Sequence, residues 1–442
     1  MRRILLVFNI SACLLSCHSK TDYAEIFKNP ELYCNTVHVL NTVVMGNNFT
    51  PIVASRNYLY AAIAAYEIIA AGYPDRYTSL AGQVHGLDKV PGPSGLGDIN
   101  FDFAALLAYC RLGESVTFPA GSMKEYVDSL KTLAKNHGMP DAIYNNSLAY
   151  ADKVASAIMN WSRHDNYAET RGSTEYDVKD SAGRWVPTPP AYFPASEPHW
   201  NEIRTLVIDS PKQFIPLPPY PFNVTDKNSN YYKEVKKIQL AIDTLTPEQA
   251  WMADFWDDNP FKMNVAGHLM FGTKKFSPGG HWMGIVGIAA MQSGADFPET
   301  VYAYAKTAIA LFDAFIQCWN IKYTYNTIRP ETVINKYFNP DWRPHLQTPP
   351  FPEYTCGHCT ISASCAEALT NVFGDNFAYN DTTETEFGIK SRDYSSFRQA
   401  AKENEKARFF GGIHYEYCCV RSNEMGKKVG DLIVERLKMK KS

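Results

Sequence analysis

The chain has 442 residues, of which 45% are hydrophobic and 20% are charged, an ordinary globular composition with ample apolar material for a core. This length predicts two domains or one large domain. The formal net charge of −3 gives no overall positive field to attract a polyanion. We therefore expect no nucleic-acid partner, and any anion site must be local.

The first residues have the features of an export signal. Arg2 and Arg3 precede a mostly apolar run over residues 4–15, which is too short to span a bilayer as a stable helix. The motif LLSC, ending at Cys17, resembles the lipobox of bacterial lipoproteins, with leucine at its second position as a small departure. We expect residues 1–17 to be a signal peptide and Cys17 to be lipidated, with a plain secretory signal as the alternative.

Such a protein would be exported and held in the cell envelope, in the periplasm or at the outer membrane. No later stretch approaches 18 consecutive apolar residues, so we expect membrane contact only through the lipid anchor. An exported chain can form disulfides, but the pairing of its cysteines cannot be read from sequence. The oligomeric state is also open, and a homodimer is one possibility.

Helical periodicity dominates the chain, whereas the alternation typical of strands is scarce. Apolar residues recur on nearly every turn of residues 51–71, 145–161 and 301–316, which predicts three buried helices. Five prolines between Trp185 and Trp200 exclude a continuous helix or central strand there and predict an irregular surface crossing.

A second proline cluster, residues 216–221, marks the predicted boundary between two halves. We predict an all-α protein of two helical-bundle halves, an N-terminal domain over residues 18–220 and a C-terminal domain over residues 221–442. The candidate site residues all fall in the second half.

The segment KYTYNTIRP places Lys322 and Arg329 seven residues apart, directly before Pro330. This spacing predicts that both cations project from one face of a helix. Two fixed cations suit an anion with several charged oxygens. Such a pair alone is usually solvated surface, so the segment is informative only in combination.

Residues 349–352 lead into the segment EYTCGHCTISAS, and three of these four residues are proline, which predicts an extended backbone there. Gly357 permits a tight turn with close backbone approach, and the apolar spacing after Thr360 predicts a helix that begins near His358. The unpaired N–H groups of a helix start favour an anion. His358 could donate or accept a proton beside it.

The segment ARFFGGIHYEY places Arg408 six residues before His414, with Gly411 and Gly412 between them. Paired glycines bend or tighten the backbone, so the two side chains could converge on one point. A lone histidine of this kind is more often structural.

Taken in order, the three segments resemble the signature of the superfamily of vanadium-dependent haloperoxidases and type 2 phosphatidic acid phosphatases. That signature is Lys, six residues, Arg-Pro; then Pro-Ser-Gly-His; then Ser-Arg, five residues, His, three residues, Asp. The matching residues are Lys322, Arg329, Pro330, Gly357, His358, Arg408 and His414. The proline-rich lead-in is similar to the haloperoxidase branch, and weaker echoes of bacterial members lie near Ser55 and Gly280.

The resemblance implies a haloperoxidase-like four-helix core in the C-terminal half, with the site at one end of the bundle. His414 would bind vanadium, or attack phosphorus in the phosphatase branch, and His358 would move protons. The oxygens of vanadate, or of phosphate in the same site, would be held by Lys322, Arg329, Arg408, Cys356 and the amide of Gly357. Trp319 and Phe351 would line the halide side, unless they are plain core aromatics.

Three positions depart from the signature. Cys356 replaces a serine, and a thiol is a weaker donor that a peroxide-binding centre can oxidise. Ala407 replaces a serine beside the arginine. Cys418 replaces the aspartate that orients the axial histidine, so another group, such as a carbonyl, must fix the tautomer of His414.

We predict an enzyme that oxidises halide, iodide or bromide, with hydrogen peroxide at a bound vanadate. One alternative is an acid phosphatase that forms a phospho-histidine. Another is a non-catalytic or thiol-redox envelope lipoprotein, because Cys356-Gly-His-Cys359 is also the tetrapeptide of disulfide isomerases. The threonine before Cys356 and the helical flanks argue against a thioredoxin-like setting.

Overall fold

The computed structural model describes residues 22–260, 262–266 and 268–441. The predicted signal peptide and the lipidation site Cys17 therefore lie outside the described residues. The described part is mostly helical, with two short antiparallel hairpins, β1–β2 and β3–β4. This confirms the prediction of an all-α protein.

The helices of the first half are α1 (Tyr23–Phe27), α2 (Pro30–Gly46), α3 (Pro51–Gly72), α4 (Phe101–Ser115), α5 (Lys124–Asn136), α6 (Asp141–Ser162), α7 (Tyr167–Thr170) and η1 (Trp200–Glu202). The later elements are α8 (Asn230–Asp243), α9 (Pro247–Phe255), β1 (Lys262–Ala266), β2 (Leu269–Thr273), α10 (Pro278–Ser293), α11 (Phe297–Tyr325), α12 (Pro330–Tyr337), α13 (Gly357–Phe373), β3 (Tyr379–Asp381), η2 (Thr385–Phe387), β4 (Arg392–Tyr394), α14 (Phe397–Phe410) and α15 (Glu416–Arg436).

The predicted helices are present, and local capping sets where they begin. Helix α3 starts at Pro51, and the N-cap Thr50 accepts a hydrogen bond from the amide of Val53. Helix α11 starts at Phe297 because Asp296 caps it, four residues before the predicted start, and it continues to Tyr325. Apolar spacing locates a helix but does not show how far a well-capped helix extends.

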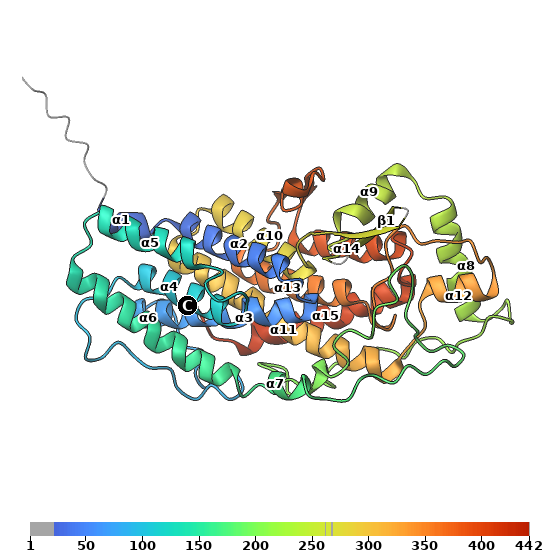
Figure 1. Ribbon diagram of the computed structural model, residues 1–442, viewed down its shortest axis with the longest axis horizontal. Helices are drawn as coiled ribbons and strands as arrows, with labels where there is room; N and C mark the ends of the chain where they lie inside the picture. Colours follow the sequence, from blue (N-terminus) through green and yellow to red (C-terminus); the bar gives the residue numbers. More distant parts are fainter. Residues whose placement is uncertain (1–21, 261, 267, 442) are drawn as a thin grey trace, which may run out of the picture.

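Helix α11 forms the centre of the molecule, and nearly all of its residues from Phe297 to Lys322 are buried. It packs against α3 on the N-terminal side and against α13 and α15 on the C-terminal side, and α13 also packs against α14. These long helices run roughly along the long axis, with α4, α5 and α6 towards one end and α8, α9 and α12 at the other (Figure 1). The buried cation Lys322 lies in the last turn of this apolar helix.

The predicted irregular segments are also present, since residues 185–199 and 216–221 contain no helix or strand. One cluster of buried hydrophobic side chains includes residues from both sides of position 220, among them Tyr58 and Phe312. The division into two domains at that position remains a prediction. Over the described residues, no helix combines the length and the apolar character that a membrane crossing requires.

The prediction that Lys322 and Arg329 lie on one face of a single helix was wrong. Helix α11 ends at Tyr325, and Asn326 then adopts a left-handed conformation with φ of 48°. Arg329 is the N-cap residue of the next helix, α12, whose first residue is Pro330. Proline disfavours helical geometry in the residue before it, so the two cations sit on either side of a break.

Candidate functional site

The structure brings the three predicted segments together at the ends of several helices. Lys322 comes from the last turn of α11, and Arg329 begins α12. Nη1 of Arg329 lies 3.1 Å from Nε2 of His414, which follows α14. Nζ of Lys322 donates to the carbonyl oxygen of Glu353, just before α13. Residues up to 92 positions apart in sequence are thus linked by these contacts.

Lys322 is fully buried, and its Nζ donates to the carbonyl oxygens of Pro352 at 2.9 Å and Glu353 at 3.1 Å. The ammonium group also lies 4.9 Å from the ring centre of Phe351 and 5.6 Å from that of Trp319. Burial lowers the pKa of Lys322, because the charged form loses hydration. The lysine is therefore held in place by carbonyls and aromatic faces.

Arg329 is also fully buried. Its Nε donates to the carbonyl oxygen of Phe351 and its Nη1 to that of Ile413, both at 2.8 Å. Burial lowers the pKa of Arg329 to about 10, so the guanidinium still carries its charge at neutral pH. Two backbone segments thus fix the guanidinium plane.

A carboxylate orients His414, and it comes from Glu353 rather than from the position that Cys418 occupies. Nδ1 of His414 lies 3.0 Å from Oε1 of Glu353, and the amide of Tyr415 donates to the same oxygen at 3.3 Å. Glu353 has no exposed surface. The sequence left this partner open, with a carbonyl as one example, and the partner is a carboxylate. With Nδ1–H donating to the carboxylate, Nε2 of His414 presents its lone pair toward Arg329.

Gly411 and Gly412 form the expected bend between α14 and α15. Gly412 has φ of +76°, a conformation that side-chain-bearing residues rarely adopt. Arg408, in the last turn of α14, donates through Nη1 to the carbonyl oxygens of Trp256 at 2.6 Å and Asp257 at 3.3 Å. The bend allows Arg408 and His414 to serve the same site.

His358 lies in the first turn of α13 with 14% of its side chain exposed, and its Nε2 is 4.0 Å from Oδ2 of the buried Asp258. Burial, and after it the positive charge of Arg408, hold the pKa of His358 well below its usual value. The imidazole is therefore neutral at neutral pH and can accept a proton.

A second buried histidine positions Asp258. Nδ1 of His281 lies 2.8 Å from Oδ1 of Asp258, and its Nε2 lies 3.0 Å from Oδ2 of Asp381. The His281 ring also stacks on Trp256 with 4.5 Å between ring centres. Burial opposes protonation of His281, but Asp258 and Asp381 outweigh it and hold its pKa well above the usual value. The imidazolium thereby anchors the carboxylate that faces His358.

The first residue of α13, Gly357, packs closely against Trp319. A Cβ atom there would lie 3.3 Å from Cζ3 of Trp319, tighter than ordinary contact. Trp319 in turn packs on Phe351, with ring centres 5.0 Å apart. Gly357 and His358 are the first residues of α13, where backbone N–H groups have no partner within the helix. The aromatic pair thus packs beside the start of α13.

Cys356 caps α13, and its Sγ accepts a hydrogen bond from the amide of Cys359 at 3.4 Å. Its own amide donates to Oγ of Ser422 at 2.8 Å. The Sγ atoms of Cys356 and Cys359 are 2.8 Å apart, and both cysteines are free. Burial opposes ionisation, but hydrogen bonds from Cys359, Cys419 and His414 hold the pKa of the Cys356 thiol well below its usual value.

These residues fit a tetrahedral oxyanion. Over the described residues, no carboxylate forms an ion pair with Lys322, Arg329 or Arg408, whose hydrogen bonds go to carbonyl oxygens and to the His414 ring. In the same part of the chain, three buried nitrogen atoms of the site lack a hydrogen-bond partner: Nη2 of Arg329, Nε of Arg408 and Nε2 of His358. Buried cations without a direct ion pair are unfavourable, so a bound anion such as vanadate or phosphate would stabilise them.

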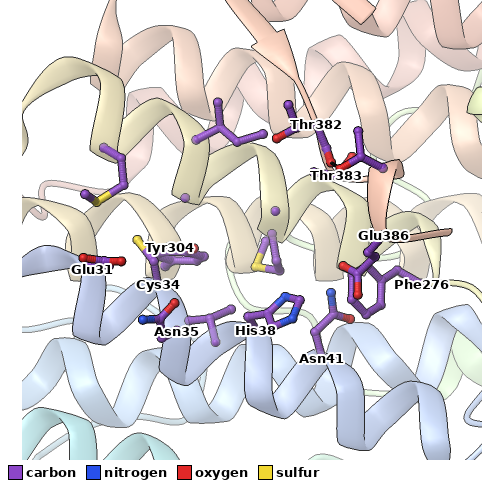
Figure 2. A pocket seen from close by; sticks show the side chains of 17 residues that line it. Glu31, Cys34, Asn35, His38, Asn41, Phe276, Tyr304, Thr382, Thr383 and Glu386 are labelled. Atoms are coloured by element: carbon purple, nitrogen blue, oxygen red, sulfur yellow. Dashed lines mark hydrogen bonds between the residues drawn. The ribbon is translucent and has the colours of Figure 1, made fainter. Parts of the chain in front are cut away.

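A small cavity of about 40 Å³ leads to this site and is lined by Phe351, His358 and Arg408 among others. A larger hollow of about 410 Å³ lies elsewhere, between α2, α10 and residues 382–386. His38 and Asn41 of α2 face Phe276 and Glu386 across it (Figure 2). None of the predicted site residues lines that hollow.

Comparison with known proteins shows the family of the chain. The family model for the VCPO second helical-bundle domain matches residues 302–341 and 339–441. A solved structure described as that of the first bacterial vanadium-dependent iodoperoxidase is 40% identical, with a TM-score of 0.88 over 94% of this chain and 98% of that chain. The chain belongs to the vanadium haloperoxidase superfamily.

Two structures of a bacterial vanadium-dependent chloroperoxidase share the fold of this vanadium haloperoxidase-type enzyme. The apo form is 17% identical, with a TM-score of 0.63 over 88% of this chain and 94% of that chain. The holo form is 16% identical, with a TM-score of 0.62 over 95% and 96% of the two chains. No curated protein matches the sequence.

Sequence reasoning missed three residues of this haloperoxidase-type site: Glu353, Asp258 and His281. Glu353 is the first residue of the EYTCGHC segment, but only the thiols and the Gly-His step of that segment were assigned a role from the sequence. His281 lies in GHWMGIV, a stretch with a weak family echo and no role attached to it. No sequence signal connects Asp258 to His358, because 100 residues separate them.

Proposed function

We propose that this enzyme oxidises iodide or bromide with hydrogen peroxide at a bound vanadate. The single observation that carries the proposal is the set of three buried cations, Lys322, Arg329 and Arg408, with Nη1 of Arg329 3.1 Å from Nε2 of His414. Over the described residues, no carboxylate forms an ion pair with these cations. The 40% identity to a bacterial vanadium-dependent iodoperoxidase supports iodide as the first halide to test.

In this proposal His414 is the protein ligand of vanadium through Nε2, since Glu353 holds the proton on Nδ1. Lys322, Arg329 and Arg408 would offset the negative charge of the oxygens, and Cys356 and the amide of Gly357 would line the same space. We call these five groups the oxyanion cradle. Bound vanadate would supply a Lewis acid that makes peroxide more electrophilic. Fixing the cations with carbonyls before the anion arrives avoids reorganisation when charge develops.

His358 is suited to proton transfer. Its low pKa leaves the imidazole neutral, so it can take a proton from an arriving hydrogen peroxide and later return it to a leaving oxygen. Its 14% exposure and the small cavity beside it connect the ring to solvent. Asp258, anchored by His281, lies on the side where the protonated ring would be stabilised. Trp319 and Phe351 would form the apolar side where halide approaches.

The test is halide-dependent consumption of peroxide by metal-free protein before and after addition of vanadate. We expect activity with iodide, and weaker activity with bromide, only in the vanadate-loaded protein. The His414→Ala variant should retain no vanadate after gel filtration, as measured by elemental analysis. Equal rates with and without vanadate for each halide would reject the proposal.

An acid phosphatase is the second candidate, because the same cradle suits phosphate and the lone pair on Nε2 of His414 suits attack on phosphorus. Turnover of a phosphomonoester that vanadate inhibits, and that is lost in His414→Ala, would favour it. Activity towards halide in the same preparation separates the two functions.

We also propose that the protein is exported and anchored in the cell envelope by lipid on Cys17, which lies outside the described residues. The motif LLSC supports this proposal. Metabolic labelling with palmitate should mark the wild-type protein and not Cys17→Ala. A labelled Cys17→Ala variant would reject the lipid anchor. The homodimer remains a possibility that sedimentation of the mature protein tests.

A further inference from the structure

Three buried thiols lie close together at the N-terminus of α13. Cys356 and Cys359 occupy the N-cap and third positions of α13, and Cys419 lies in the first turn of α15. The sulfur of Cys356 is 2.8 Å from that of Cys359, and all three sulfur atoms lie within 4.8 Å of one another. Each of the three is buried and free.

The position of Cys356 links these thiols to oxyanion binding. It directly precedes Gly357, whose amide begins α13, and it replaces the serine of the superfamily signature. Its sulfur accepts a hydrogen bond from the Cys359 amide at 3.4 Å and lies 2.8 Å from the Cys359 sulfur. A cysteine that reacts with peroxide and has a second thiol beside it can form a disulfide.

We propose that hydrogen peroxide oxidises Cys356, and that Cys359 then closes a Cys356–Cys359 disulfide that weakens oxyanion binding in the cradle. The proposal rests on the proposed function in one respect, namely that a peroxide-using site brings this oxidant to Cys356. Thiol and disulfide are the two states of a modification site inside the anion pocket.

The chemistry balances with one peroxide. The Cys356 thiolate attacks one peroxide oxygen, the O–O bond breaks, and the leaving oxygen takes a proton and departs as water, which leaves a sulfenic acid. The Cys359 sulfur then attacks the Cys356 sulfur, the S–O bond breaks, and the hydroxyl leaves as water with the Cys359 proton. Two thiols are oxidised to one disulfide while one peroxide is reduced to two waters.

The geometry favours Cys359 as the partner. Its sulfur is already within hydrogen-bond distance of Cys356, and a disulfide bond of about 2.05 Å requires only a small further approach. The two residues also share one turn of α13, so closure needs no movement between helices. Cys419 belongs to α15, and a bond to it would tie two helices together.

Disulfide formation would change the start of α13. In the reduced protein the Cys356 sulfur accepts a hydrogen bond from the Cys359 amide at 3.4 Å. A bond between the two sulfur atoms would move the Cys356 sulfur from that position, which caps α13 and sets the direction of the Gly357 amide. Serine in place of Cys356 would keep a side-chain acceptor for the Cys359 amide and could not be oxidised in this way.

The experiment uses the mature protein, fully reduced, desalted and free of vanadate and halide. One equivalent of hydrogen peroxide should remove two titratable thiols per chain, and peptide mapping should identify a Cys356–Cys359 link. Vanadate affinity, measured by calorimetry, should fall at least about tenfold and return after treatment with dithiothreitol. Cys356→Ser should bind vanadate equally before and after peroxide.

Cys365→Ser is the matched control, because Cys365 is a buried thiol of the same helix that does not belong to the three-thiol cluster. It should keep the full response to peroxide. The proposal is overturned if thiol content is unchanged, if the link joins Cys356 to Cys419, if a disulfide forms without loss of vanadate affinity, or if elemental analysis finds one zinc held by the three thiolates.

The thiol titration does not depend on halide oxidation, so it separates this proposal from the proposed function. Disulfide formation in a protein that shows no vanadate binding when reduced would leave the thiol chemistry intact and reject the haloperoxidase proposal together with the effect on the cradle. Strong vanadate binding whose affinity is the same before and after peroxide treatment would reject only the proposed modification site.

Discussion

Replacing Glu353 by glutamine isolates the effect of one charge on His414. Oε1 of Glu353 lies 3.0 Å from Nδ1 of His414 and 3.3 Å from the amide of Tyr415, in a fully buried setting. Glutamine keeps the size of the side chain, and the Tyr415 amide favours its carbonyl oxygen in the same place. The substitution therefore removes the negative charge while it retains an acceptor for Nδ1–H.

The magnitude follows from the two kinds of hydrogen bond. A bond to a charged group contributes about 1.5–3 kcal/mol and a neutral one about 0.5–1.5 kcal/mol, so the loss is about 1–1.5 kcal/mol. Since about 1.4 kcal/mol corresponds to a tenfold change, vanadate affinity should fall about tenfold. Glu353→Ala also leaves Nδ1 without its partner, and a loss of about 100-fold is expected for it.

One effect opposes this loss, because removing the Glu353 charge also removes its repulsion of a bound oxyanion. Calorimetric titration with vanadate at fixed pH measures the balance, and nitrogen NMR of the imidazole reports which nitrogen of His414 carries the proton. Glu331→Gln is the matched control, since Glu331 is a buried carboxylate of α12 that accepts a hydrogen bond from Thr348 instead of a histidine. Unchanged or tighter binding by Glu353→Gln would refute the assigned role.

Two further predictions concern packing and pH. In Gly357→Ala the new Cβ would lie 3.3 Å from Cζ3 of Trp319, so we expect the indole ring to be displaced. The free energy of unfolding should fall by about 1 kcal/mol, and vanadate affinity should weaken several-fold. Tryptophan fluorescence and calorimetry measure these changes. Burial raises the pKa of Asp102 to about 7, although the Tyr73 hydroxyl that donates to it acts in the opposite direction. Its folded-state pKa exceeds the unfolded value, so this contribution to stability is complete below about pH 4 and is lost as the pH rises through 7. Between pH 5 and 8 the free energy of unfolding of the wild type should therefore fall by about 2–3 kcal/mol more than that of Asp102→Asn in urea titrations, and parallel curves would contradict the assignment.

Local patterns predicted the helices well because their causes are local. The apolar face of residues 51–71 and the Pro51 start of α3 are both properties of neighbouring residues. The break between Lys322 and Arg329 depended on Asn326 adopting a left-handed conformation, which a two-turn spacing argument does not include. The seven-residue spacing correctly predicted that Lys322 and Arg329 lie near each other, but a loop between two helices brings them together instead of one helix face.

The residues of the candidate site that follow the spacing of the family signature could be predicted from the sequence. The residue that only a tertiary contact brings to the site could not. The cations and both histidines matched a known order along the chain, so they could be named from the sequence. Glu353 could not, because it reaches His414 from a position 61 residues earlier in the sequence, through the fold of the segment before α13. A missing carboxylate at residue 418 indicated that a substitute must exist but not where.

A compensating variant tests directly whether Glu353 takes the place of the aspartate that the superfamily signature has at residue 418. Cys418 stands where the superfamily signature has aspartate, and its Sγ lies 3.6 Å from Nδ1 of His414 and 3.9 Å from the carbonyl oxygen of Glu353. An aspartate at residue 418 could therefore reach Nδ1 from α15. In the wild-type background it would also face the buried Glu353 carboxylate, and two like charges in one buried site are unfavourable. Cys418→Asp alone should lower the thermal unfolding temperature.

In the double variant, Glu353→Gln with Cys418→Asp, the aspartate supplies the charge that glutamine lacks, and the like-charge conflict disappears. Vanadate affinity should return to within about threefold of wild type, so the two substitutions should show a favourable coupling of about 1 kcal/mol in a double-mutant cycle. Calorimetric titration of the four proteins measures this coupling. If the double variant binds vanadate no better than Glu353→Gln, then Glu353 acts through the conformation of its own loop, and the carboxylate at Nδ1 does not set the affinity.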